Sequence, residues 1–121
     1  MKATEIIAAN ARKKGQDPKY VLKKINMALA SKKAFLLKQN DSVLLCVYIG
    51  PHAIETHIYT EDSPLALLHA LKVFIAKIKN SHIDVVYGNA NNPGIIKLLK
   101  TTGLEVEHSD IEGYNFKAVN K

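Results

Sequence analysis

The sequence predicts an α/β (or α+β) protein with one mixed central sheet, helices on both faces of the sheet, and the element order ααβββαβαββ. Three observations predict this class. Amphipathic helical stripes open the chain and recur in its second half. Three apolar runs joined by short turn segments fill residues 34–60. A helical segment then separates the third run from a short β-branched run, an order typical of two parallel strands joined by a crossover.

Two amphipathic helices are expected before the first strand. Thr4 is a suitable N-cap for a helix that reaches about residue 13, and Gly15 interrupts the pattern. Asp17 and Pro18 begin the second helix, because Asp is a good cap and Pro fits the first helical position. Its apolar residues recur at helical spacing between residues 21 and 29, and lysines at positions 32 and 33 close it.

Three strands are expected at residues 34–38, 43–49 and 53–60, with turn residues between them. The middle run is almost unbroken in its apolar character, which is typical of a central strand. In the third strand one set of side chains is mostly apolar and the alternate set is polar: Glu55, His57 and Tyr59. Short connections predict an antiparallel meander in which the third strand has one polar face.

The stretch from residue 63 to residue 104 reads as helix, strand, helix. Ser63 and Pro64 begin the first helix, whose apolar stripe extends from residue 67 to residue 78. Residues 83–87 form a short strand, and residues 89–92 break it. Pro93 begins a helix that Gly103 ends as a left-handed cap. Residues 105–109 and 114–119 then form a final hairpin, with a turn near Gly113.

Length and composition favour one domain spanning residues 1–121. The single cysteine, Cys46, excludes an internal disulfide and lies in an apolar run, where a small core residue is expected. No apolar run is long enough for a membrane span, and the first residues do not resemble an export signal. The sequence therefore predicts a protein made in a reducing cytoplasm.

Charge is unevenly distributed. The chain carries a net charge of +6, whereas residues 1–33 hold nine basic and two acidic side chains, so the rest carries about −1. This basic region is interpreted first as a solvated helix surface, with an anionic partner as the alternative. The residues that would meet such a partner, whether protein or nucleic acid, are Arg12, Lys13, Lys14, Lys19, Lys23 and Lys24.

One motif resembles a known family. Residues 92–104 read Asn-Pro-Gly-Ile-Ile-Lys-Leu-Leu-Lys-Thr-Thr-Gly-Leu. The GCN5-related N-acetyltransferase (GNAT) superfamily has Asn, two variable residues, a small or apolar residue, Ile, a variable residue, Leu, Tyr, three variable residues, Gly and Phe at the same spacing. The element order extends the resemblance over nearly the whole chain, and similarity of residues is confined to about positions 60–104. The resemblance implies a GNAT-like fold.

Two departures from the family pattern bear on function. The resemblance implies a Gly-rich loop that holds the coenzyme A pyrophosphate with bare amides before the central helix. Here that loop has no glycine and contains Glu61, Asp62, Ser63 and Pro64; two carboxylates stand where a diphosphate would bind, and Pro64 has no N–H. The resemblance also implies a tyrosine as general acid, and that position is Leu99.

The leading hypothesis is therefore a catalytically inactive GNAT-like protein, a pseudoenzyme without cofactor that acts by binding other proteins. Degenerate forms of this kind occur among small virion proteins of short-tailed bacteriophages, including an internal virion protein, and the segment from residue 60 to the final hairpin is similar to them. This resemblance implies a structural virion component, present in the host cytoplasm during assembly and then in the particle, with other virion proteins as partners.

Two alternatives stay open. An active N-acyltransferase using acetyl-coenzyme A would draw its base from Glu55, His57 or Tyr59 and its acid from Tyr87 or Tyr59. A nucleic-acid-binding module would use the basic N-terminal residues named above, although only one aromatic residue, Tyr20, lies among them. The five histidines and Cys46 show no metal-ligand spacing, so no metal is expected.

Overall fold

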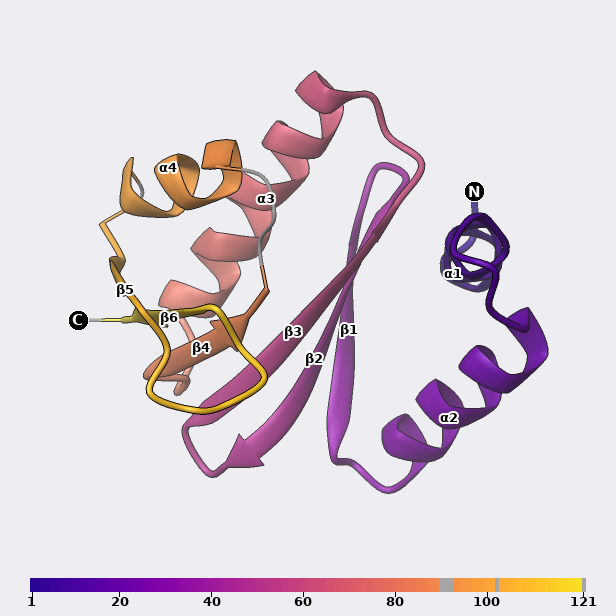
Figure 1. Ribbon diagram of the computed structural model, residues 1–121, viewed down its shortest axis with the longest axis horizontal. Helices are drawn as coiled ribbons and strands as arrows, with labels where there is room; N and C mark the ends of the chain where they lie inside the picture. The colour runs from indigo at the N-terminus through magenta and orange to yellow at the C-terminus, as the bar shows by residue number, and fades with distance from the viewer. Residues whose placement is uncertain (90–92, 102, 121) are drawn as a thin grey trace.

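The structure is a computed structural model that describes residues 1–89, 93–101 and 103–120 (Figure 1). The described helices are α1 (Ala3–Lys13), α2 (Pro18–Ala30), α3 (Pro64–Lys79) and α4 (Pro93–Thr101). The described strands are β1 (Ala34–Gln39), β2 (Ser42–Gly50), β3 (Ala53–Thr60), β4 (Val85–Gly88), β5 (Glu105–Glu107) and β6 (Phe116–Val119). This order and the mixed sheet confirm the predicted fold class.

The six strands form one sheet in the order β1-β2-β3-β4-β6-β5. The first three form the predicted antiparallel meander, and β6 pairs antiparallel with both β4 and β5. Only β3 and β4 are parallel among the described strands, and α3 is the crossover that joins them. A parallel pair cannot be joined by a tight turn, so the helix between the two strands is a geometric requirement.

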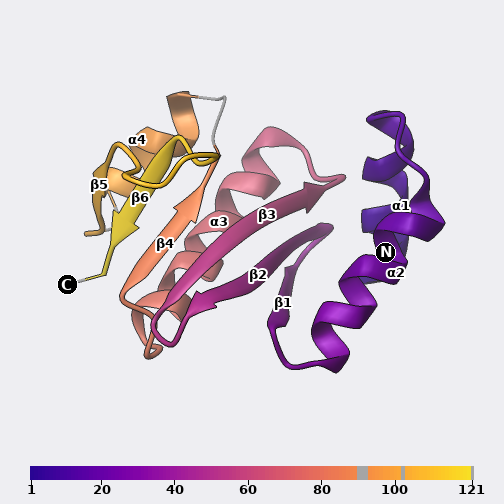
Figure 2. The same cartoon turned by 60° about the horizontal axis from the view of Figure 1, so that its bottom comes forward.

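Helices cover the meander on both faces, with α1 and α2 on one side and α3 on the other (Figures 1 and 2). Successive side chains of β2 point to opposite faces of the sheet, so they contribute to two separate hydrophobic cores. Val43 and Leu45 pack with α1 and α2, whereas Leu44 and Cys46 pack with α3. Burial of β2 on both faces explains its near-continuous apolar sequence. Each fully buried aliphatic side chain contributes roughly 1.5–3 kcal/mol to the stability of the fold.

The helix starts follow their capping residues. Asp17 accepts a hydrogen bond from the Lys19 amide at 3.1 Å and begins α2, as predicted. The predicted start of α1 at Thr4 is wrong: the helix begins at Ala3, because the Glu5 carboxylate accepts a hydrogen bond from the Lys2 amide at 3.0 Å and thereby caps an earlier turn.

Strand β4 is shorter than predicted. The expected run began at residue 83, but Ile83 and Asp84 precede the strand, and the Asp84 amide donates to the carbonyl of His52 at 2.8 Å. This bond fixes the segment to the β2–β3 turn, so pairing with β3 begins only at Val85. Ile83 is nevertheless buried in the α3-side core.

The final hairpin is also shorter than predicted. Residues 108–115 leave the sheet between β5 and β6, because their side chains bond to other strands. Tyr114 donates to Glu55 on β3, and Asp110 accepts from Tyr87 on β4. The expected left-handed glycine at the end of α4 is confirmed, with φ +85° at Gly103.

Part of the predicted motif lies outside the described residues, namely Asn92 and Thr102, as does most of the predicted break at residues 89–92. Among the helices that the structure describes, none has both the length and the apolar character that crossing a membrane requires.

Candidate functional site

The parallel strands β3 and β4 part from each other after a short pairing. They pair only over Ala53–Val85, Ile54–Val86 and Glu55–Tyr87 among the described residues. Beyond that point β3 continues to Thr60, whereas β4 ends at Gly88, and the two strands visibly diverge (Figure 2). At this part of the sheet α3 and α4 lie on one face and α2 lies on the other.

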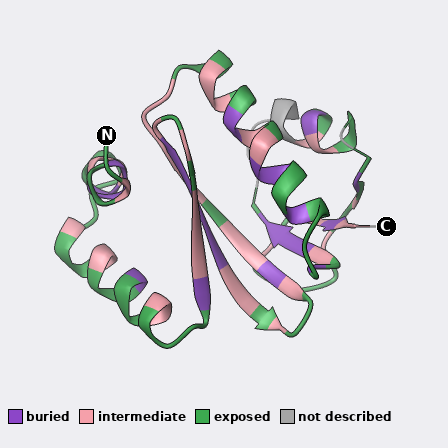
Figure 3. Cartoon of the chain, turned by 180° about the vertical axis from the view of Figure 1, so that it is seen from behind, coloured by how far each residue is buried: buried purple, intermediate pink, exposed green. Residues whose placement is uncertain are grey.

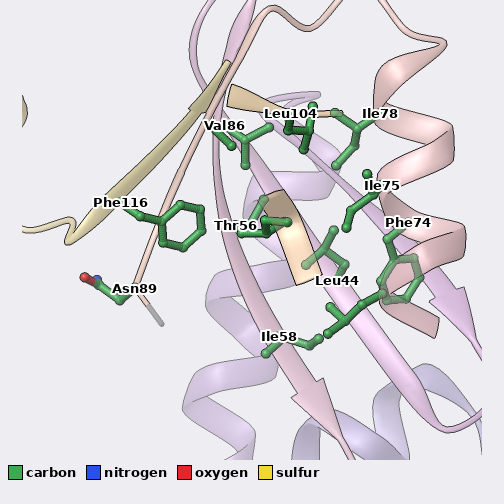
Figure 4. Close-up of a pocket in the computed structure, with 13 residues that line it drawn as sticks. Leu44, Thr56, Ile58, Phe74, Ile75, Ile78, Val86, Asn89, Leu104 and Phe116 are labelled. Carbon is green, nitrogen blue, oxygen red and sulfur yellow. The ribbon is translucent and has the colours of Figure 1, made fainter. Parts of the chain in front are cut away.

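On the α3 side of the sheet lies an apolar pocket of about 90 Å³ (Figure 4). Its walls come from β2, β3, β4, α3, α4 and β6, and they include Leu44, Ile58, Leu71, Phe74, Leu99 and Phe116. Sites for small organic ligands usually enclose about 300–1,000 Å³. At about 90 Å³, this pocket lies well below that range.

The segment that leads from β3 to α3 is bonded to β2. The Asp62 carboxylate accepts hydrogen bonds from the Ser42 hydroxyl at 2.6 Å and from the Asp41 amide at 3.1 Å. Ser42 is fully buried, and its oxygen also lies 2.7 Å from the Thr60 hydroxyl. Asp62 therefore neither caps α3 nor points toward a ligand at the helix end; its charge is held against β2.

Main-chain amides around the start of α3 bond to the chain's own oxygens. Ser63 supplies the cap: its hydroxyl accepts from the Ala66 amide at 3.4 Å and its carbonyl accepts from the Leu67 amide at 2.9 Å. The Glu61 amide donates to the Asp41 carbonyl at 2.9 Å, and the Asp62 amide donates to the Thr60 hydroxyl at 3.0 Å.

The same segment therefore does not fit a diphosphate. A phosphate cradle needs several amides that point at one anion. Four amides here have internal partners, and Pro64 has no N–H to donate. The Glu61 carboxylate forms an ion pair with Lys13, so that part of the loop is also engaged by α1.

Leu99, at the position of the family's tyrosine, is half-buried and packs against the α3-side core. It contributes an apolar wall to the 90 Å³ pocket. An aliphatic side chain has no ionisable proton, so no general acid comes from this position.

The opposite face of the sheet holds a polar cluster. Glu55 and His57, two residues apart on β3, approach to 3.2 Å between a carboxylate oxygen and Nε2. The Tyr114 hydroxyl donates to the other oxygen of Glu55, and the Tyr114 ring lies 5.6 Å from that of Tyr87. The structure thus joins two residues predicted from the sequence with a tyrosine that sequence reasoning missed.

Tyr87 is buried and donates a hydrogen bond to Asp110 at 3.1 Å. Burial, and then the bond to Asp110, raises the pKa of Tyr87 above its ordinary value. The pKa of Asp110 is lowered, first by a hydrogen bond from its own amide and then by the bond from Tyr87. Lys117 lies 3.6 Å from Asp110 and 3.8 Å from Glu107, which extends the charged row across β6 to β5.

Tyr59, the third polar residue of β3, faces an open cavity of about 520 Å³ between α2 and the sheet. Glu55 and His57 line the same cavity, and Asp17 and Tyr20 line it from the start of α2. Burial raises the pKa of Tyr59. The three predicted β3 residues therefore share one cavity, whereas Tyr87 contacts the cluster through the ring of Tyr114.

The six basic residues named from the sequence are exposed along the end of α1 and the start and middle of α2. Lys13 pairs with Glu61, and the Lys24 ammonium lies 5.1 Å from the centre of the Tyr20 ring. Tyr20 is 59% exposed. An anionic partner on this surface stays a prediction.

Metal-binding side chains do not gather anywhere in the described ranges: no group of three His, Cys, Asp or Glu residues could hold an ion there.

Comparison with known proteins supports the fold. No protein-family model matches the chain, and no curated protein sequence matches it either. Among solved structures, the chain is similar to a chimera of the spermidine N-acetyltransferase SpeG from Vibrio cholerae and hSSAT, with a TM-score of 0.55 at 12% sequence identity. The alignment covers 86% of this chain and 75% of that one. At this identity the likeness concerns the fold alone, and the chain therefore has the fold of a GNAT protein.

Proposed function

We propose that this protein is a GNAT-fold protein that does not transfer acyl groups and acts by binding other proteins. The observation that carries this proposal is the bonding of Asp62 to Ser42 and Asp41 in the segment before α3. That segment is where a coenzyme-dependent relative would hold a diphosphate. The resemblance to virion proteins of short-tailed bacteriophages suggests a structural component of a particle as the setting.

The expected interaction energies argue against coenzyme binding. A phosphate brought within about 4 Å of a carboxylate is repelled by about 1 kcal/mol in water and by about 4 kcal/mol in a partly desolvated site. Opening the loop to relieve that repulsion would leave the fully buried Ser42 hydroxyl without its carboxylate partner, which costs a further ~1–3 kcal/mol. Hydrogen bonds from the loop amides to a phosphate would offset little of this cost, because each amide would first have to give up its present partner in the chain.

Titration of the protein with acetyl-coenzyme A in a calorimeter tests the proposal. We expect no saturable heat. The control is the same titration with the variant Glu61→Gln, Asp62→Asn, which removes both loop charges but keeps hydrogen-bonding groups. Saturable binding by the unaltered protein, together with release of free thiol when an amine is added, would exclude the proposal.

A second candidate function is N-acyl transfer through a rebuilt cofactor site. It is favoured by the contact of Glu55 with both His57 and Tyr114 beside the point where β3 and β4 diverge. In this candidate Glu55 or His57 accepts a proton from an amine that enters the 520 Å³ cavity. Turnover should fall in Glu55→Gln and in His57→Ala; if both variants keep full turnover, these residues are not the base.

A further inference from the structure

Strand β1 forms one edge of the sheet and is open to a further strand. Among the described residues it pairs only with β2, in a register without bulges from Ala34–Val47 to Gln39–Ser42. Seen from behind, β1 crosses in front of the other strands, between α2 and α3, with no ribbon over it (Figure 3). The opposite edge, β5, is three residues long and begins and ends with glutamate.

The hydrogen-bonding groups of β1 that face outward belong to alternate residues. The Tyr48 amide donates to the Lys33 carbonyl at 2.8 Å, so this pair belongs to the hydrogen-bonded set of the β1–β2 ladder. Bonded pairs alternate in an antiparallel ladder. The amides and carbonyls of Ala34, Leu36 and Lys38 therefore point away from β2.

This edge has only one of the features that usually prevent pairing with another strand. Proteins protect an open edge with proline, a bulge or charged side chains, lysine above all. The described β1 sequence is Ala-Phe-Leu-Leu-Lys-Gln, which has no proline and one charge. The charged residue is Lys38, whose ammonium donates a hydrogen bond to the Asn40 carbonyl of the same chain at 2.7 Å.

We infer that β1 pairs antiparallel with β1 of a second copy of this chain, which joins two sheets into one. The register that uses every outward residue is centred on Leu36: Leu36 faces Leu36 of the second copy, and Ala34 faces Lys38 in both directions. In that register no charged residue faces a like charge. A register centred on Lys38 would place two lysines opposite each other, which is unfavourable.

Side chains on the α3 face complement the same register. Phe35 of one copy would lie opposite Leu37 of the other as a non-bonded pair, the closer of the two kinds. Phe35 and Leu37 border a cavity of about 190 Å³ that Ile78 and Ile83 also line. The phenyl ring of the second copy would lie beside this cavity, which Lys77 and Ser81 also line.

The test compares Leu36→Pro with Leu36→Ala. Both variants lose the leucine side chain, but only proline also removes the outward N–H, and both central hydrogen bonds use that N–H. Light scattering coupled to gel filtration should give the mass of two copies for the unaltered protein and for Leu36→Ala at high concentration, and of one copy for Leu36→Pro. Circular dichroism checks that each variant folds.

Amide hydrogen exchange on the unaltered protein supplies a readout that does not depend on any variant. The amides of Ala34, Leu36 and Lys38 should exchange more slowly at high protein concentration than at low concentration. The inference is overturned if the protein has the mass of one copy at every concentration. It is also overturned if a dimer forms without slower exchange at these three amides, or if they slow only when a different protein is added.

Discussion

The Asp62 carboxylate, on the segment between β3 and α3, accepts a hydrogen bond of 2.6 Å from the hydroxyl of Ser42 at the start of β2. Ser42 is fully buried, and its hydroxyl also contacts Thr60. The side chain of Asn10 adds a bond from α1, donating to the Thr60 carbonyl at 2.9 Å. The end of β3 is thus bonded to the two elements beside it, β2 and α1.

Asp62→Ala should lower the free energy of unfolding by about 1–3 kcal/mol, because it leaves the buried Ser42 hydroxyl without its carboxylate partner. Urea unfolding followed by circular dichroism measures the change. Glu61→Gln is the matched control: it breaks the pair with Lys13, whose side chain is 66% exposed, and should cost less than about 1 kcal/mol. Equal effects of the two substitutions would contradict the role given to Asp62.

Gly88→Ala should destabilise the fold by about 1–3 kcal/mol through overcrowding. A Cβ at this position would lie 2.7 Å from a ring carbon of Phe116 and 3.1 Å from the Thr56 hydroxyl, so the ring must move. Thermal unfolding measures the loss. Gly50→Ala is the control, because its Cβ would meet Ala53 at an ordinary 3.8 Å. Adding Phe116→Leu should recover part of the stability of Gly88→Ala; no recovery would show that Phe116 is not the obstacle.

The buried thiol of Cys46 should make the protein less stable at alkaline pH. Burial raises the pKa of its thiol from 9.0 to about 12. The folded state therefore keeps a proton that the unfolded state releases above pH 9, and stability falls as pH rises from there toward the folded-state pKa. The limiting slope is about 1.4 kcal/mol per pH unit. Tyr59 and Tyr87, whose pKa values burial also raises, add to the decline at higher pH.

Urea unfolding at a series of alkaline pH values measures this decline, and Cys46→Ala isolates the part due to the thiol. The slope just above pH 9 should be shallower in Cys46→Ala than in the unaltered protein. In the same pH range iodoacetamide should modify Cys46 only after denaturation. A slope unchanged by the substitution would show that the thiol is not protected by burial.

Tyr114→Phe should release the segment 108–115 from the sheet. The lost hydrogen bond is to the Glu55 carboxylate, and bonds to charged groups contribute about 1.5–3 kcal/mol. Hydrogen exchange should become faster at residues 108–115 while the amides of β2 keep their protection. Tyr20→Phe is the control, because that side chain is 59% exposed and should leave exchange unchanged. Unchanged exchange in Tyr114→Phe would mean that other bonds fix the segment, such as those from Tyr87 to Asp110 and from Asn89 to the Gly113 carbonyl.

The sequence alone determined the element order, the antiparallel meander and the helix crossover before β4. These features follow from local patterns: the near-continuous apolar run of β2, the Asp17 and Ser63 caps, and the left-handed glycine at position 103. The sequence also pointed to Glu55 and His57 as neighbours, since residues two apart on a strand share a face.

Only the tertiary structure decided which distant groups complete each site. Asp62 meets Ser42, and Tyr114 meets Glu55, across separations of 20 and 59 residues. No local pattern encodes such pairs, because they depend on how strands and loops are placed by the packing of the whole core. The same reason explains the place of Asp62: Ser63 caps α3, whereas the Asp62 carboxylate accepts a hydrogen bond from the buried Ser42 hydroxyl on β2.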